Sequence, residues 1–135
     1  MKRTSLLAVA LGAALVLGGQ AAVAQDGEQV FKRCMACHAL EKGQNKVGPY
    51  LFGVVGREAG SAEGYRYSDI NATAGELGLV WTKENIVAYL PNPQAFLEAY
   101  IKENGGDAKG RTKMTYRLPK ADDAAAVADY LETIK

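Results

Sequence analysis

The sequence contains little of several features that would point to common classes of protein. Of its 135 residues, one is a histidine and two are cysteines, and 16 basic residues nearly balance 15 acidic ones. A chain without a basic excess is not expected to bind nucleic acid. No run reaches the ~20 apolar residues that a membrane span needs. A charged fraction of 23% is ordinary, which excludes a disordered, highly charged tail.

The first 24 residues have the pattern of a secretory signal. A short basic head precedes an apolar run of 13 residues, Leu6–Gly18, and residues 22–24 read Ala-Val-Ala, a cleavage pattern. We expect cleavage after Ala24, export to the periplasm, and one domain over residues 25–135. An uncleaved membrane anchor is the alternative. The leader holds two basic and no acidic residues, so residues 25–135 carry a net charge of −1.

The two cysteines and the single histidine lie together in the sequence. Residues 34–38 read Cys-Met-Ala-Cys-His, the C-x-x-C-H pattern that attaches a c-type haem. On one helical turn, two thiols at this spacing reach the two vinyl groups of a porphyrin, and the adjacent imidazole binds the iron. The pattern therefore predicts that Cys34 and Cys37 hold the haem covalently and that His38 is an axial ligand.

Three other kinds of site compete for these residues. A dithiol–disulfide oxidoreductase usually carries its two cysteines within a βαβ pattern, which does not surround this site. A tetrahedral zinc site would lack its fourth ligand, because the sequence has no other Cys or His. A structural disulfide is allowed in an exported protein but leaves the histidine unexplained.

The second axial ligand is predicted by elimination among three methionines. Met1 leaves with the leader, and Met35 sits on the attachment turn, from which it cannot reach the opposite face of the ring. Met114 remains, in an irregular stretch before the last predicted helix. A thioether is the usual partner of histidine in electron-carrying haems. The alternative is a surface methionine with five-coordinate or lysine-ligated iron.

Capping residues and apolar periodicity predict an all-α fold of four or five short helices. We expect helices over about 27–34, 82–90, 93–104 and 120–133. Residues 39–80 are predicted to be mostly loop because glycines interrupt every long periodicity. A stretch this long without regular structure is unusual in a compact domain. A large apolar cofactor at the centre would complete the core.

The order of motifs resembles that of the class I c-type cytochromes, and more narrowly the bacterial cytochrome c2-like carriers. The resemblance covers residues 26–135, and the segment from about Phe96 to Arg111 is longer than in the mitochondrial type. It implies a class I cytochrome c fold, with loops wrapped around one covalently attached haem c. The motifs are Cys34-x-x-Cys37-His38, Gly48-Pro49, Gly56-Arg57, Gly64 to Asn71, Trp81-Thr82, Tyr89-Leu90, Thr112-Lys113-Met114 and Ala128 to Leu131.

The resemblance also implies roles for residues around the haem. The Pro49 carbonyl would accept a hydrogen bond from the free ring N–H of His38, and the Tyr89 hydroxyl would point at the Met114 sulfur. Asn71 would help to order a buried water. Donors are needed for two propionates in an apolar pocket, and those implied are Arg57, Tyr67, Trp81 and Thr112.

The predicted ligation leaves no open coordination site on the iron, so we expect an electron carrier rather than an enzyme. The resemblance implies a soluble, monomeric carrier between a quinol-cytochrome c reductase and a terminal oxidase or photosynthetic reaction centre. A haem peroxidase or gas-binding domain, or a bound redox subunit of a dehydrogenase, are the alternatives. Docking is assigned to basic residues that flank the attachment turn and the Met114 stretch: Lys32, Arg33, Lys46, Lys109, Lys113 and Arg117. Acidic residues, Asp123 among them, are expected on the other side.

Overall fold

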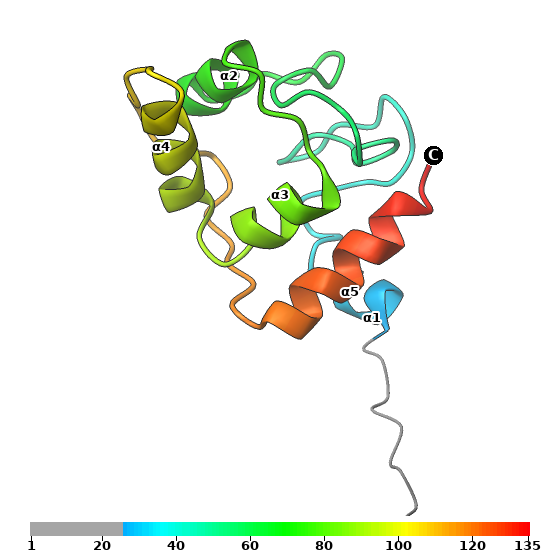
Figure 1. The fold of residues 1–135 in the computed structure, drawn as a ribbon. Coiled ribbons are helices and arrows are strands. Elements are labelled where there is room, and N and C mark those ends of the chain that lie inside the picture. Colours follow the sequence, from blue (N-terminus) through cyan, green and yellow to red (C-terminus); the bar gives the residue numbers. More distant parts are fainter. Residues whose placement is uncertain (1–25) are drawn as a thin grey trace, which may run out of the picture.

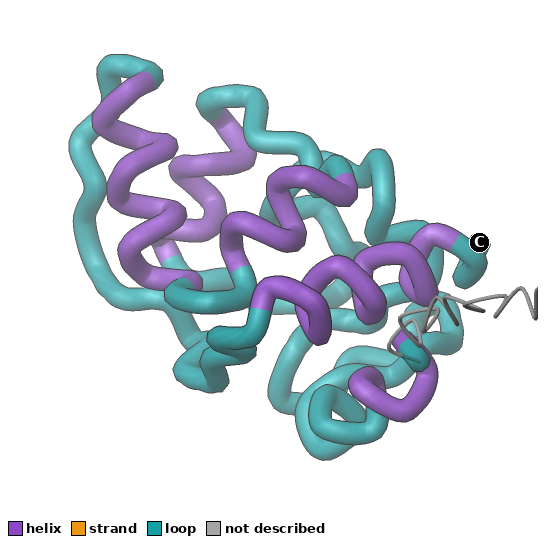
Figure 2. The backbone as a smooth tube through the Cα atoms, turned by 60° about the horizontal axis from the view of Figure 1, so that its bottom comes forward, coloured by secondary structure: helices purple, strands orange, loops and turns teal. Residues whose placement is uncertain are grey.

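The structure of the protein is a computed structural model that describes residues 26–135, so the expected leader and its cleavage site lie outside the described residues. In this part of the chain, five helices are joined by long loops (Figures 1 and 2): α1 (Gly27–Phe31), α2 (Asp69–Glu76), α3 (Lys83–Tyr89), α4 (Pro93–Glu103) and α5 (Ala121–Glu132). Extended pairing within residues 26–135 is limited to one isolated antiparallel bridge between Glu58 and Val80. The predicted all-α fold with short helices is confirmed.

Side-chain caps set the start of three helices, as the sequence predicts. The carboxylate of Asp26 accepts the Glu28 N–H at 3.0 Å, and the Thr82 hydroxyl accepts the Asn85 N–H at 3.1 Å. Asn92 caps α4 in the same way, with a proline as the first helical residue. The first helix is shorter than predicted, because α1 ends at Phe31 and residues 32–37 continue as turns.

The prediction that residues 39–80 are mostly loop is wrong for α2. Ser68 precedes this helix and Asp69 begins it, while Ile70 and Ala74, four residues apart, are fully buried. Asn, Thr and Gly, which are poor helix formers, occupy much of its eight residues, so local propensity gives little signal. Burial of one apolar face against the rest of the chain stabilises the helix instead.

Two groups of helices surround the centre of the molecule. The last helix, α5, packs on α1 and α3, and α4 packs on α2 and α3. The α1–α5 crossing is very close, because a Cβ on Gly27 would lie 2.1 Å from the Ala126 carbonyl oxygen. The rings of Phe31 and Tyr130 meet at 5.7 Å beside it. These contacts fix the position of the chain just before the cysteines.

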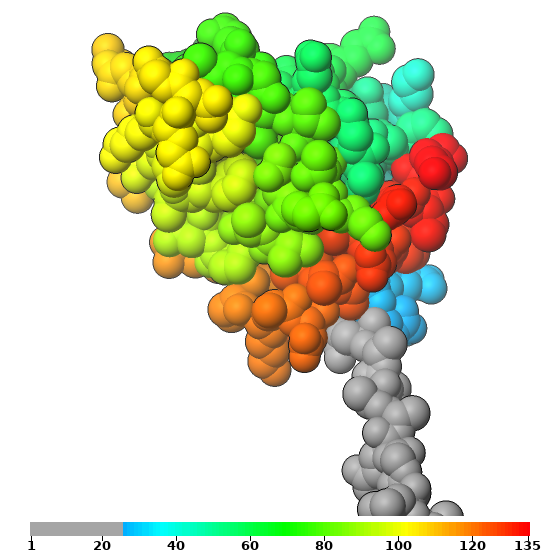
Figure 3. All heavy atoms as spheres, in the orientation of Figure 1, coloured from blue at the N-terminus to red at the C-terminus, as the bar shows by residue number. Residues whose placement is uncertain are grey.

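The loops of residues 39–68 and 104–120 close the remaining sides. On the face shown in Figure 3, helices α3, α4 and α5 form a continuous surface without a deep hollow. In the part of the chain that the structure describes, no helix has the length and apolar character needed to cross a membrane.

Candidate functional site

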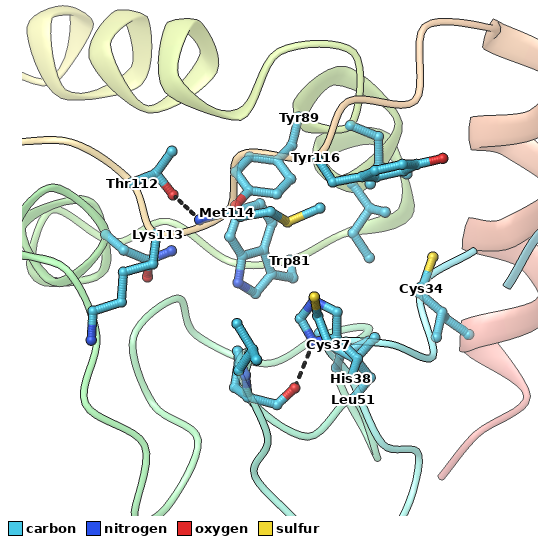
Figure 4. A pocket seen from close by; sticks show the side chains of 18 of the residues that line it. Cys34, Cys37, His38, Leu51, Trp81, Tyr89, Thr112, Lys113, Met114 and Tyr116 are labelled. Carbon is cyan, nitrogen blue, oxygen red and sulfur yellow. Dashed lines mark hydrogen bonds between the residues drawn. The ribbon is translucent and has the colours of Figure 1, made fainter. Parts of the chain in front are cut away.

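A cavity of about 320 Å³ lies between the helices and the loops. Figure 4 shows the side chains that face it, with sulfur atoms on different sides of the same space. Its walls are mostly apolar and aromatic, and they come from segments spread along the whole described chain. The apolar and aromatic lining residues include Phe31, Val47, Leu51, Val54, Tyr65, Trp81, Ile86, Tyr89, Leu90, Tyr116, Val127 and Leu131.

The turn that carries both cysteines forms one wall of the cavity. The His38 N–H donates to the Cys34 carbonyl at 3.0 Å, and the Cys37 N–H donates to the same carbonyl at 3.1 Å. These bonds make one helical turn of residues 34–38, which brings both thiols and the imidazole to the cavity wall. Burial raises the pKa of the Cys34 thiol. The two cysteines form no disulfide, so both sulfur atoms are available to a cofactor.

The ring of His38 is held firmly in one orientation. Its Nδ1 lies 2.7 Å from the Pro49 carbonyl oxygen, so Nδ1 carries the proton and Nε2 keeps its lone pair. Burial lowers the pKa of His38, and the hydrogen bond to Pro49 offsets this only in part. Gly48 packs directly on the ring, since a Cβ there would lie 2.4 Å from Cε1. The result is a neutral, oriented imidazole with a free ring nitrogen.

Met114 lies across the cavity from His38 and Cys37 (Figure 4), on the irregular segment between α4 and α5. Its N–H donates to the Thr112 hydroxyl at 3.2 Å. Next to it, the Lys113 ammonium bonds the Arg66 carbonyl and lies 5.4 Å from the centre of the Tyr65 ring. The thioether of Met114 and the imidazole of His38 therefore face one shared space.

An aromatic cluster forms the wall behind Met114. The rings of Trp81 and Tyr89 meet edge to face at 4.7 Å, and Phe96 packs on both. Burial raises the pKa of Tyr89 to about 12. Tyr89 and Met114 line the same cavity, and the expected contact of the Tyr89 hydroxyl with the Met114 sulfur stays a prediction.

Three polar residues that line the cavity have unused hydrogen-bonding capacity. Arg57 donates through its two Nη atoms to the carbonyls of Tyr50 and Phe52, while its buried Nε has no partner among the described residues. The Tyr67 hydroxyl accepts the Ala62 N–H at 3.0 Å and retains its own proton. Asn71 is buried, and its Oδ1 also lacks a partner in residues 26–135.

These features fit a haem. An apolar cavity suits a porphyrin, two adjacent thiols suit its vinyl groups, and an imidazole and a thioether on opposite sides suit its iron. The unpartnered Arg57 Nε and the free proton of Tyr67 are donors for carboxylates that would otherwise be costly to bury. Other donors expected for the propionates, Trp81 and Thr112, line the same cavity.

The residues assigned to docking are all exposed, but several are already paired. Arg33 bonds Asp123 at 2.8 Å, although Asp123 was expected on the opposite side, and that carboxylate is buried. Lys109 pairs with Asp107, and Lys46 bonds the Met35 carbonyl. Lys32 contacts the side chain of Gln29. The expected separation of acidic and basic residues is therefore wrong at Asp123.

Sequence reasoning gave no role to two residues that shape the site. Gly48 gives room for the His38 ring, and the only signal for it was its place before Pro49. Gln94 on α4 binds the segment that leads to Met114, and its contacts join residues 16 and 18 positions apart. No local pattern marks such a contact, because it depends on how α4 packs.

Comparisons with known proteins find one matching family, with similar sequences and similar solved structures. A sequence model named cytochrome c matches residues 24–135. Cytochrome c2 of Rhodopseudomonas palustris is 52% identical over 114 residues, covering 83% of this chain and 98% of that protein. Cytochrome c2 iso-1 of Rhodospirillum centenum is 53% identical over 110 residues, covering 79% and 92%. The solved structure of cytochrome c2 from Rhodospirillum centenum superposes with a TM-score of 0.79 at 50% identity, over 81% of this chain and 95% of that one.

Proposed function

Because the chain belongs to the cytochrome c family, we propose that it is a periplasmic carrier between membrane redox complexes. It accepts one electron at a time from a quinol-cytochrome c reductase and delivers it to a terminal oxidase or a photosynthetic reaction centre. The cofactor is the covalently attached haem c of this family, which supplies a one-electron Fe(III)/Fe(II) couple when bound. Its cleaved leader ends at Ala24, and the mature chain acts as a monomer.

The observation that carries this proposal is the placement of His38 and Met114 on opposite sides of one apolar cavity. His38 would bind the iron through its free Nε2 from one side, and Met114 would bind it through its sulfur from the other. The protein would then leave no coordination site for a substrate, so electron transfer would be outer-sphere. This favours a carrier over a haem peroxidase or a gas-binding domain.

The other residues orient these ligands and keep water away. Cys34 and Cys37 fix the cofactor through thioether bonds, and Pro49 holds the His38 ring and increases its basicity. Arg57, Tyr67, Trp81 and Thr112 would bind the propionates, and Asn71 would hold a buried water. The soft sulfur of Met114 favours the reduced state and raises the potential.

Replacing Met114 tests the ligand assignment. Met114→Ala should keep the haem, because Cys34, Cys37 and His38 remain. It should lower the reduction potential substantially, within the roughly 0.8 V range that axial ligands command. It should also let small ligands bind the iron. Met35→Ala is the matched control, since Met35 is exposed on the attachment turn and its loss should leave the spectrum and potential unchanged. An unchanged potential in Met114→Ala would contradict the assignment.

The mass of the protein from the periplasmic fraction tests attachment and export together. The mature chain should begin at Gln25, carry one haem, and resist alkylation at Cys34 and Cys37. A folded, haem-free chain with a disulfide between the two cysteines would exclude the carrier function. Retention of residues 1–24 would exclude cleavage and indicate an anchored form.

A further inference from the structure

Gln94, near the start of α4, binds the segment that precedes Met114 at two points. Its Oε1 accepts the Thr112 N–H at 2.8 Å, and its Nε2 donates to the Gly110 carbonyl at 3.2 Å. A further bond from Nε2 to the Glu98 carboxylate, at 2.7 Å, fixes the amide on the helix. One side chain therefore holds the backbone of residues 110–112 against α4.

This contact leads directly to the axial ligand. The Thr112 N–H binds Gln94, and the Thr112 hydroxyl accepts the N–H of Met114 at 3.2 Å. The side chain of Gln94 thus acts on Met114 through one residue. It lies outside the haem cavity, among whose lining residues it is not found.

The segment has few other attachments. Outside the helices, residues 107–117 make no backbone–backbone hydrogen bond to any other residue in the described range 26–135. The nearest such bonds are Gly106 N–H to Ile101 on one side and Leu118 N–H to Leu90 on the other. Besides Gln94, the Lys113 ammonium ties the segment to the Arg66 carbonyl. Side-chain contacts therefore provide much of what holds residues 107–117 to the rest of the fold.

A second cavity gives the segment room to move. It has a volume of about 160 Å³ and is lined by Gln94, Thr112, Met114 and Arg117, among others. Thr112, Met114 and Thr115 line both this space and the haem cavity, so this stretch of chain lies between the two. A Met114 side chain that leaves the iron could enter the second space.

We propose that Gln94 is a positioning residue that keeps Met114 on the iron and so sets how readily an external ligand replaces it. This inference rests on the proposed axial role of Met114. An external ligand binds only the fraction of molecules in which Met114 has left, so its apparent affinity rises in proportion to that fraction. The net contribution of one hydrogen bond corresponds to roughly 2- to 12-fold in an equilibrium constant. Loss of both backbone contacts should raise the affinity by at least about fivefold.

Imidazole is the probe, titrated into the ferric holoprotein and followed by its visible spectrum. Gln94→Leu removes both backbone contacts at similar side-chain size and should bind imidazole at least about fivefold more tightly than the wild type. Gln29→Leu is the matched control, because Gln29 is a helical glutamine whose contact is to Lys32, and its affinity should match the wild type. Gln94→Glu keeps an oxygen acceptor for Thr112 but replaces the donor to Gly110 and Glu98 with a second carboxylate, which Glu98 repels, so its affinity should also rise above the wild type.

The same titration in a Met114→Ala background separates the possible causes. Without the methionine there is nothing for Gln94 to hold, so Gln94→Leu should then have no effect on imidazole affinity. An equal rise in that background would mean that Gln94 controls access in general, which overturns the proposal. Wild-type affinity in both Gln94→Leu and Gln94→Glu would overturn it as well. If Gln94→Leu fails to fold, Gln94→Glu is the deciding variant. A rise in its imidazole affinity supports the proposal, and an unchanged affinity overturns it.

Two different results distinguish a wrong axial ligand from a wrong role for Gln94. If Met114→Ala alone binds imidazole no better than the wild type, Met114 does not occupy the iron, and the proposed ligation falls together with this inference. If Met114→Ala binds much more tightly and the Gln94 variants are unchanged, the ligation stands and the role of Gln94 alone is refuted.

Discussion

Replacing Gly48 with alanine should displace the ring of His38. A Cβ at this position would lie 2.4 Å from Cε1, 2.8 Å from Nδ1 and 2.9 Å from Nε2 of the imidazole, whereas ordinary contact begins at 3.4 Å. The ring or the backbone must therefore move by about 1 Å, more than the ~0.5 Å that a functional site tolerates. The backbone is restrained, because the Gly48 N–H bonds the Cys37 carbonyl and its own carbonyl accepts the Lys46 N–H.

The cost of this substitution follows from two contributions. Overpacking of a close contact costs about 1–3 kcal/mol. Weakening of the hydrogen bond between His38 and Pro49 adds about 1 kcal/mol. A total of about 2–4 kcal/mol corresponds to a fall in Tm of roughly 9–17 °C for a domain of this size. Denaturant unfolding of the ferric holoprotein measures the loss, and its visible spectrum reports the change at the iron.

Gly43→Ala is the matched control for Gly48→Ala. Gly43 has a φ of +81° and no atom within 4 Å of its Cβ position, so alanine there introduces backbone strain alone. We expect a loss of about 1 kcal/mol and an unchanged spectrum. If Gly48→Ala were no less stable than Gly43→Ala and kept the wild-type spectrum, the reasoning about the His38 ring would be refuted.

Three further predictions concern the surface, an ion pair and the core. Lys32→Glu should slow electron exchange with an acidic redox partner several-fold at low salt, while Lys102→Glu, the same charge change on α4, should do much less; equal effects would reject oriented docking. Arg33→Ala should lower the Tm more than Lys32→Ala does, since it leaves the buried Asp123 carboxylate without its partner; equal Tm values would show that the pair adds no stability. Leu97→Ala should cost about 2–5 kcal/mol in unfolding free energy with an unchanged visible spectrum, because Leu97 is fully buried.

The structure changes the interpretation of the docking residues. From the sequence, Arg33 and Asp123 belong to opposite faces, but in the fold they are bonded at 2.8 Å across 90 residues. Part of the charge of Arg33 is therefore neutralised locally, and Lys32 is the better residue for a docking test. Lys113 is also engaged, with the Arg66 carbonyl, so replacing it would change the Met114 segment as well as the surface charge.

A comparison of α2 with α3 and α4 shows how far local patterns reach. Thr82 and Asn92 cap α3 and α4, and their side chains bond the backbone three residues further on, so the sequence predicts where these helices start. In α2 no side-chain cap bond is present, and the helix depends on burial of Ile70 and Ala74. Such burial involves partners distant in sequence, which local patterns do not report.

The chemistry proposed for this protein could be predicted from the sequence, because it depends on which residues are present and on spacings within one turn. One histidine next to a C-x-x-C pair, and one methionine outside the leader and the attachment turn, left few choices for the ligands. The tertiary structure alone decided what holds those ligands in place. Gly48 against His38, and Gln94 against the Thr112 amide, are contacts between segments that only packing brings together. Their energies depend on distances of tenths of an ångström, which are set by the packed core as a whole and by no single stretch of sequence.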